Sequence, residues 1–126
     1  HLSLRRQRQM CIRDSPGISA ALSRSAALLR DDADALDAIA LDAMSTMKLS
    51  DLICADLERL PRAIRTRILR AAIYAAGAPS GSITADHVAS IEALVTSWKG
   101  QGVMSLPGGV KVERISGRLS LLAQSG

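Results

Sequence analysis

The stretch that decides the fold runs from Arg59 to Pro79 and reads RLPRAIRTRILRAAIYAAGAP. Pro61 suits the first turn of a helix, where its missing N–H is not needed, and Gly77 followed by Pro79 suits a helix end. Between these signals, apolar residues recur at helical spacing and fall on one side: Ile64, Ile68, Ala71, Ala72 and Ala75. The pattern predicts a core helix over residues 61–76.

Positive charge is concentrated on the same predicted helix. Arg62, Arg67 and Arg70 lie largely on the face opposite the apolar one, and Arg65 lies at its flank. A solvated basic face on a core helix is the simpler interpretation. A helix that contacts phosphate groups is the functional alternative, and composition alone does not decide between the two.

The first fifteen residues have the sequence of a translated sequencing adapter. RRQRQMCIRD, at residues 5–14, back-translates to a transposase adapter used to build sequencing libraries. We interpret residues 1–15 as an assembly artefact without ordered structure and expect a longer native chain upstream of Pro16. A genuine basic arm for nucleic acid is the alternative. Sequencing the source DNA across the junction of Ser15 and Pro16 distinguishes them.

Setting residues 1–15 aside changes the charge balance. The full chain carries 16 Lys and Arg against 12 Asp and Glu, whereas residues 16–126 carry 12 against 11. The remaining charge is unevenly divided, with 3 basic and 8 acidic residues in 16–58 and 9 basic and 3 acidic residues in 59–126. The asymmetry favours a polyanionic partner, and neutralisation of one half by the other within the fold explains it equally simply.

Residues 16–126 predict about one domain with an aliphatic core. Tyr74 and Trp98 are the only aromatic residues, so we expect Trp98 to be the one large filler of the core rather than a platform for bases. With Cys11 in the adapter, Cys54 is expected to be a small buried apolar residue without a disulfide or metal partner. No apolar run approaches the ~18 residues of a membrane span, and a reducing cytoplasm fits.

Further elements are predicted on both sides of the central helix. Residues 16–48 predict a long helix whose apolar stripe packs on its own domain or, alternatively, forms a coiled-coil homodimer. Residues 49–60 fit either a short extended piece or one to two helical turns. Residues 85–99 predict a helix with Thr84 as N-cap, and His87 in its first turn is expected to be structural or capping.

The C-terminal residues predict a small β-meander. The expected strands are residues 103–106, 110–115 and 119–122, separated by turns at Pro107-Gly108-Gly109 and Ser116-Gly117. A few short strands need support from helices to be stable. The predicted fold class is therefore α+β, mainly α, with a long helix, a helix pair and this meander.

No catalytic or metal-binding signature is present in residues 16–126. The Gly-Lys-Ser/Thr ending of a P-loop and the GxGxxG pattern are both missing. Ser80 lacks the glycine two residues earlier that a nucleophile elbow requires. His87 and Cys54 alone cannot form a zinc site. We expect no catalytic, cofactor-binding or metal-binding residue in this part of the chain.

From Pro16 to Leu122, the order of features resembles the C-terminal region of the shorter, actinobacterial form of tRNA(Ile)-lysidine synthetase. The resemblance rests on PGISAALSRSAALLRDDADALDAIA at 16–40, LERLPRAIRTRILRAAIYAAGAPSGSITADHVASIEALV at 57–95 and SWKGQGVMSLPGGVKVERISGRL at 97–119. It implies an ATP-dependent ligase. Such enzymes adenylate the wobble cytidine of the tRNA(Ile) CAU anticodon, and lysine then displaces AMP to give lysidine. The ATP and Mg site lies in an N-terminal PP-loop domain that no residue here matches.

The resemblance also implies a division of labour. Residues 16–48 would be a linker helix, and residues 49–126 a small domain that helps hold tRNA(Ile), while lysine and ATP bind elsewhere in the complete enzyme. Phosphate contacts, which position RNA without reading its sequence, would come from Arg62, Arg65, Arg67, Arg70, Lys99, Lys111, Arg114 and Arg118. A free-standing helical interaction or nucleic-acid-binding module is the alternative. A PP-loop domain encoded before Pro16 would support the ligase, and a nearby start codon the alternative.

Overall fold

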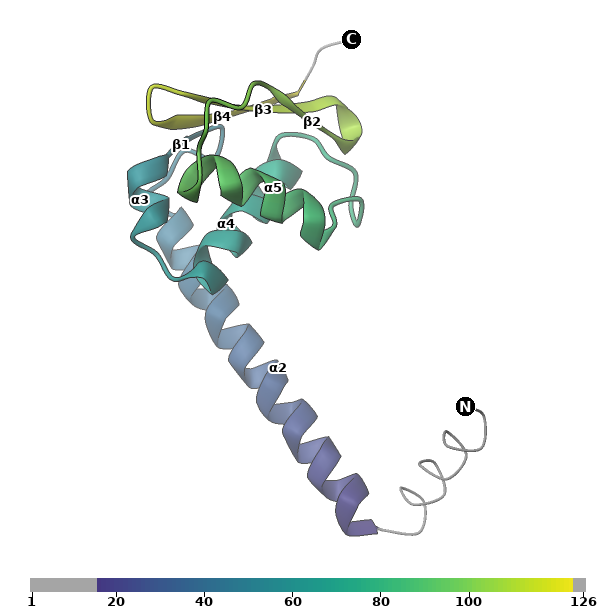
Figure 1. The fold of residues 1–126 in the computed structure, drawn as a ribbon. Helices are drawn as coiled ribbons and strands as arrows, with labels where there is room; N and C mark the ends of the chain where they lie inside the picture. The colour runs from purple at the N-terminus through teal and green to yellow at the C-terminus, as the bar shows by residue number, and fades with distance from the viewer. Residues whose placement is uncertain (1–15, 124–126) are drawn as a thin grey trace. The chain divides into compact units, whose positions relative to one another are not determined.

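A computed structural model describes residues 16–123, and this part of the chain has an α+β fold (Figure 1). The prediction for residues 1–15 lies outside the described residues. The elements, in chain order, are α2 (Pro16–Met44), β1 (Asp51–Ile53), α3 (Cys54–Glu58), α4 (Arg62–Ala75), α5 (Ala85–Thr96), β2 (Met104–Leu106), the 3₁₀ turn η1 (Pro107–Gly109), β3 (Val110–Ile115) and β4 (Arg118–Ala123). The predicted fold class is confirmed.

The apolar stripe of α2 has two environments along one continuous helix of 29 residues. Near its C-terminal end, Ala40 is buried, and its neighbours on the stripe pack against the core: Leu36, Ala43 and Met44. Nearer its N-terminal end, large apolar residues are exposed: Ile18, Leu22, Leu28 and Leu29. The chain accordingly divides into two compact units between Ala35 and Leu36, inside α2.

None of the helices in residues 16–123 combines the length and the apolar character needed to cross a membrane.

The sheet contains one strand more than the predicted meander. Its four antiparallel strands follow the order β1-β4-β3-β2. The segment 49–60, for which an extended piece and a helical turn fitted equally well, contains both, because β1 leads directly into α3. The strand is recruited because Leu52 pairs with Leu119 of β4, and both side chains are buried on the same face of the sheet. The predicted three-stranded meander is corrected to a four-stranded sheet.

The core lies between one face of this sheet and the helices α3, α4 and α5 (Figure 1). Strand alternation places one set of residues toward the helices, and all of them are buried: Leu52, Val110, Val112, Leu119 and Leu121. On α4 the buried set is wider than the predicted face, since Leu69 and Ile73 are buried and Ala75 is exposed. The helix is therefore covered on more than one side, and a single stripe describes it incompletely.

Two glycines, Gly77 and Gly108, lie where the backbone after α4 approaches the turn between β2 and β3. Gly77 ends the helix with φ +124°, as the sequence predicted, and Gly108 has φ +82° inside η1. A Cβ atom on Gly108 would lie 2.7 Å from Cδ of Pro79 and 2.8 Å from the carbonyl oxygen of Gly77. Only a residue without a side chain allows the two backbones to approach this closely.

Trp98 is not the core filler that the sequence predicted, since 48% of its surface is exposed. The helix α5 ends at Thr96, and Ser97 leaves the helical conformation with φ −138° and ψ 42°. Trp98 therefore does not continue the buried face formed by Val88, Ile91 and Val95. The core is filled by aliphatic side chains instead.

Candidate nucleic-acid interface

A buried carboxylate on α5 organises the arginine-rich face of α4. Glu92 is the buried charged residue of the described chain, and its side chain is 12% exposed. Nε of Arg62 donates to Oε1 of Glu92 over 3.2 Å, and Nε of Arg65 donates to Oε2 over 2.9 Å. The two arginines have different surroundings, because the side chain of Arg65 is 12% exposed and that of Arg62 is 73% exposed.

Arg65 is built into the fold by further contacts. Its Nη1 donates to the carbonyl oxygen of Leu60 over 2.9 Å and approaches that of Leu57 at 3.5 Å. These carbonyls lie at the end of α3 and in the turn that leads into α4. The guanidinium thus joins three elements, and its donors face protein groups rather than solvent.

Arg67 and Arg70 also have partners within the domain. Nε of Arg67 donates to Oδ1 of Asp37 on α2 over 2.6 Å, and its Nη1 donates to the carbonyl oxygen of Ala63 over 2.9 Å. Nη1 of Arg70 donates to the carbonyl oxygen of Ile83, just before α5, over 2.7 Å. The four arginines therefore connect α4 to its neighbours as well as carrying its positive charge.

A groove of 370 Å³ lies between α4 and α5. Arg62 and Arg70 border it on α4 and are about 12 Å apart along the helix axis at 1.5 Å per residue. Small side chains and one valine line the rest: Ala63, Thr66, Ala85, Val88 and Ala89. The groove is thus a surface depression bordered by two arginines of α4.

Arg114 points into the protein rather than out of it. It continues the alternation of Val110 and Val112 along β3 and pairs in register with buried Leu119. Its Nη1 donates to the carbonyl oxygens of Leu94 over 2.8 Å and of Val95 over 3.1 Å, near the end of α5. Carbonyl oxygens at a helix C-terminus lack partners within the helix and carry partial negative charge, so Arg114 acts as a cap for α5.

The remaining predicted cations lie nearer to solvent. Nζ of Lys111 donates to Oγ of Ser105 on the neighbouring strand over 2.6 Å. Nη1 of Arg118 contacts Oδ2 of Asp51 over 2.8 Å, and its side chain is 56% exposed. Lys99 is exposed in the loop after α5, and its side chain makes no hydrogen bond or ion pair within residues 16–123.

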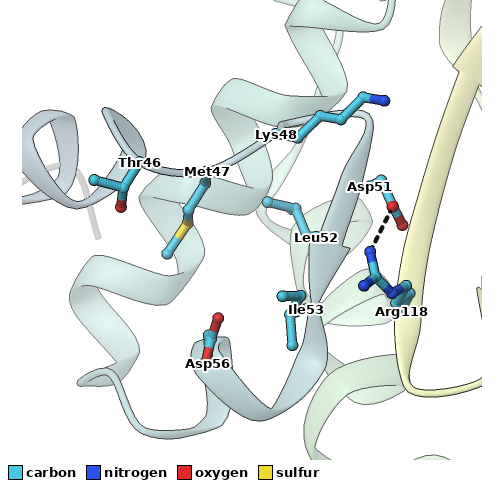
Figure 2. A pocket seen from close by; sticks show the side chains of 8 residues that line it. All are labelled: Thr46, Met47, Lys48, Asp51, Leu52, Ile53, Asp56 and Arg118. Carbon is cyan, nitrogen blue, oxygen red and sulfur yellow. Dashed lines mark hydrogen bonds and ion pairs between the residues drawn. The ribbon is translucent and has the colours of Figure 1, made fainter.

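Arg118 also lines a pocket of 240 Å³ beside β1, where Figure 2 shows its ion pair with Asp51. Lys48 and Asp56 are among the other lining residues. The pocket therefore contains two cationic and two carboxylate side chains. This balance of charge does not by itself favour an anion.

Sequence reasoning missed Glu92, although a signal was present. Glu92 follows Val88 by four residues and precedes Val95 by three, so helical spacing places it on the apolar face of α5. A carboxylate on such a face requires a buried cationic partner. The partner was available in the arginines of α4.

The capping role predicted for His87 and the burial predicted for Cys54 are confirmed. Nδ1 of His87 accepts from the backbone N–H of Thr84 over 3.0 Å, and the N–H of His87 donates to Oγ1 of Thr84 over 3.2 Å, which completes a capping box at the start of α5. Cys54 is a buried free thiol. Its burial raises the pKa of the thiol, against the opposing charge of Arg114.

These features define a small α+β module in which an arginine-rich helix and a short sheet share one core, attached to the end of a long helix. A family model described as "TilS substrate binding domain" matches residues 52–120. The chain belongs to this family, as its resemblance to tRNA(Ile)-lysidine synthetases predicted.

Three relatives show the extent of the similarity. All are called tRNA(Ile)-lysidine synthase. The protein of Thermobifida fusca is 49% identical over 110 residues, which is 86% of this chain and 34% of that protein. The relatives from Streptomyces coelicolor and Salinispora arenicola are 48% and 39% identical over 105 and 109 residues, covering 82% and 85% of this chain and 30% and 33% of theirs. The chain thus spans about a third of the length of these relatives.

Proposed function

We propose that this chain is the part of a tRNA(Ile)-lysidine synthase that holds and positions the tRNA. The match of residues 52–120 to a substrate-binding domain carries the proposal, and the excess of basic residues in 59–126 supports it. The complete enzyme would use ATP and Mg to join lysine to the wobble cytidine of tRNA(Ile), and it would act in the cytoplasm. Both lysine and ATP would bind outside this module.

The described residues do not fit an ATP site. A phosphate cradle requires a glycine-rich turn that opens into a helix N-terminus. The turn Pro107–Gly109 leads into the strand β3. The loop with Gly77 and Gly81 does lead into α5, but the side chains of Thr84 and His87 form a capping box at the start of that helix. No step of the ligation is therefore assigned to this part of the chain.

Among the eight predicted phosphate contacts, the exposed cations are the best candidates. Arg118 is paired with Asp51 near the surface, and such pairs are worth about 0–1 kcal/mol. Arg62 is mostly exposed, and its partner Glu92 keeps the ion pair with Arg65 when Arg62 is withdrawn. Exchanging the carboxylate for an RNA phosphate therefore costs little at either arginine. The side chain of Lys99 has no hydrogen bond or ion pair in residues 16–123 to give up.

Arg65 and Arg114 are poor candidates for the opposite reason. Moving Arg65 toward RNA would leave the buried carboxylate of Glu92 without its best-enclosed partner, and breaking a buried pair costs about 3–5 kcal/mol. Moving Arg114 would uncap α5. We propose that these two residues support the RNA-binding surface without contacting RNA.

The salt dependence of tRNA binding tests this assignment. We expect the triple variant Arg62→Gln, Lys99→Gln and Arg118→Gln to bind labelled tRNA more weakly and to lower the slope of log K against log salt by about 0.7–0.9 for each lost contact. Filter binding over a series of salt concentrations measures the slope. The control is Arg24→Gln with Arg30→Gln, which removes two exposed positive charges from α2, so the two variants are compared per charge removed.

The control variant should keep the wild-type slope, because its charges lie on the acid-rich helix. An unchanged slope in the triple variant would remove these three residues from the interface. Equal losses per removed charge in the triple variant and the control would show that binding depends on net charge and not on this surface.

A further inference from the structure

Trp98 is a large apolar side chain held at the surface. It is 48% exposed, although a chain with a single tryptophan and no phenylalanine has few bulky residues with which to fill its core. Its position follows from the end of α5 at Thr96, after which Ser97 leaves the helical conformation and carries the indole off the buried face.

The indole is supported from below by an immobilised cation. Cζ of Arg114 lies 5.0 Å from the centre of the Trp98 ring, a favourable distance for a cation–π contact. Two helix carbonyls, those of Leu94 and Val95, fix the guanidinium. Its Nε is buried and has no hydrogen-bond partner within residues 16–123, and Arg114 forms no ion pair with a carboxylate in that part of the chain.

The loop that follows Trp98 is exposed and carries one positive charge, that of Lys99. Lys99 follows Trp98 directly and is exposed, while its backbone N–H donates to Oε1 of Gln101 over 2.6 Å. Gly100 has φ +80°, and a Cβ atom on Gly100 or Gly102 would meet nothing within 4 Å. The two glycines that follow Lys99 are therefore in open space, and the side chain of Lys99 has no hydrogen bond or ion pair within residues 16–123.

We propose that Trp98 is a stacking site for an unpaired nucleobase of the bound RNA, with Lys99 contacting the adjoining phosphate and Arg114 positioning the indole. The inference rests on the proposed tRNA-binding function and adds a contact that phosphate binding alone does not provide. Stacking on an aromatic ring requires a base that is not inside a duplex. The expected ligand is thus a single-stranded RNA segment.

Charge complementarity favours RNA over an apolar protein surface as the occupant. The charged residue that contacts the ring, Arg114, is a cation, and so is Lys99, the next residue in the sequence. A covering apolar partner would have to desolvate them without compensation, which is costly. A polyanion with aromatic bases matches both the charge and the ring.

Because Trp98 is the single tryptophan of the 126-residue chain, its fluorescence reports on this site alone. We expect a single-stranded oligoadenylate to quench this fluorescence in a saturable manner, and a blunt RNA duplex of the same length to bind without quenching it. Intact tRNA should also quench. Comparison with tRNA trimmed of its single-stranded 3′ end tells whether the stacked base comes from that end or from a loop.

Variants separate stacking from folding. Measured by anisotropy of labelled RNA, Trp98→Ala should weaken oligoadenylate binding by about tenfold, within the range known for one stacked base, and change duplex binding by less than about twofold. Trp98→Phe should retain most of the affinity, and circular dichroism checks that both variants fold. Tyr74→Phe, which keeps the other aromatic ring, is the matched control and should behave as wild type.

Two outcomes would overturn the inference. One is saturated binding of oligoadenylate without quenching of Trp98, and the other is an equal loss of duplex and single-strand affinity in Trp98→Ala. Absence of oligoadenylate binding with intact binding of tRNA and duplex would refute the stacking site and leave the proposed function standing. Absence of binding to every RNA would refute both.

Discussion

The arginines of α4 and the loop after α5 carry positive charge in different ways. Arg65 on α4 is 12% exposed and paired with a buried carboxylate, whereas Lys99 in the loop is exposed without a partner in the described residues. The helix has the denser charge in the sequence, and the loop has the more available charge in the structure. A run of arginines in the sequence therefore shows how much positive charge a helix carries. It does not show how much of that charge is available to bind an anion.

The same contrast exists within α4. Arg62 and Arg65 share the carboxylate of Glu92, yet Arg62 is 73% exposed and Arg65 is enclosed by α3, the following turn and α5. Arg65 therefore connects elements of the fold, whereas Arg62 is largely exposed to solvent.

The largest expected effect follows from removing the buried carboxylate. Glu92→Ala should lower the free energy of unfolding by about 3–5 kcal/mol, because Arg65 is left as an unpaired buried charge. Asp37→Ala is the matched control. It removes the partner of Arg67 from a site where Asp37 is 66% exposed, so it should cost about 0.2–1 kcal/mol.

Urea denaturation measures both variants under the same conditions. Similar losses in the two variants would contradict the distinction between a buried and an exposed pair. Glu92→Gln, which keeps the shape of the side chain without its charge, should fall between them.

An intermediate effect on stability is expected from replacing each of the two arginines that share Glu92 with lysine. Arg65→Lys loses the fork that reaches both the carboxylate and the carbonyl oxygen of Leu60, so stability should fall by about 1–3 kcal/mol. Arg62→Lys retains a positive charge at an exposed position and should change stability by less than about 0.5 kcal/mol. Thermal or urea unfolding measures the stability of both variants. A larger loss of stability in Arg62→Lys than in Arg65→Lys would contradict the prediction.

The smallest expected effect is a change in the pKa of the Cys54 thiol when the charge of Arg114 is removed. Burial raises the pKa of the Cys54 thiol, Arg114 lowers it, and Glu58 raises it. Arg114→Met should therefore raise this pKa further, and Glu58→Gln should lower it. Alkylation rates against pH, measured in a Cys11→Ser background, report the shift as a displaced midpoint.

The sign of the linked stability follows from the raised pKa. Folding favours the protonated thiol, so this contribution to stability is present below the pKa of the unfolded chain and is lost as pH rises through the folded pKa. Cys54→Ala should remove that alkaline decline. A decline of the same size in Cys54→Ala would assign it to other groups.

Much of the fold could be predicted from periodicity and turn chemistry. The helices α2, α4 and α5 and the strands β2, β3 and β4 lie within a few residues of their predicted positions, because their caps and turns are local signals. The strand β1 has three residues, too few for alternation to be recognised, and exists because β4 offers it an edge. The contribution of β1 therefore depends on a partner more than sixty residues away.

The candidate site was predicted less completely for the same kind of reason. Residue type marks Arg62, Arg65, Arg67 and Arg70 equally, and local spacing does not say which will meet Glu92 or Asp37. The inward direction of Arg114 could have been read from its place in the alternation of Val110 and Val112. The exposure of Trp98 could not, because it depends on where α5 ends.

The sequence by itself determined the helices, the turns, the apolar residues of the core and the excess of basic charge after residue 58, since each follows from local conformational preference or composition. Only the tertiary structure decided which of those charges are paired within the protein and which remain exposed. It brought Glu92 to α4, turned Arg114 toward the end of α5 and left Trp98 and Lys99 at the surface. The physical reason is that burial and pairing are properties of elements that pack together, and a charge becomes available to a partner only where packing leaves it unsatisfied.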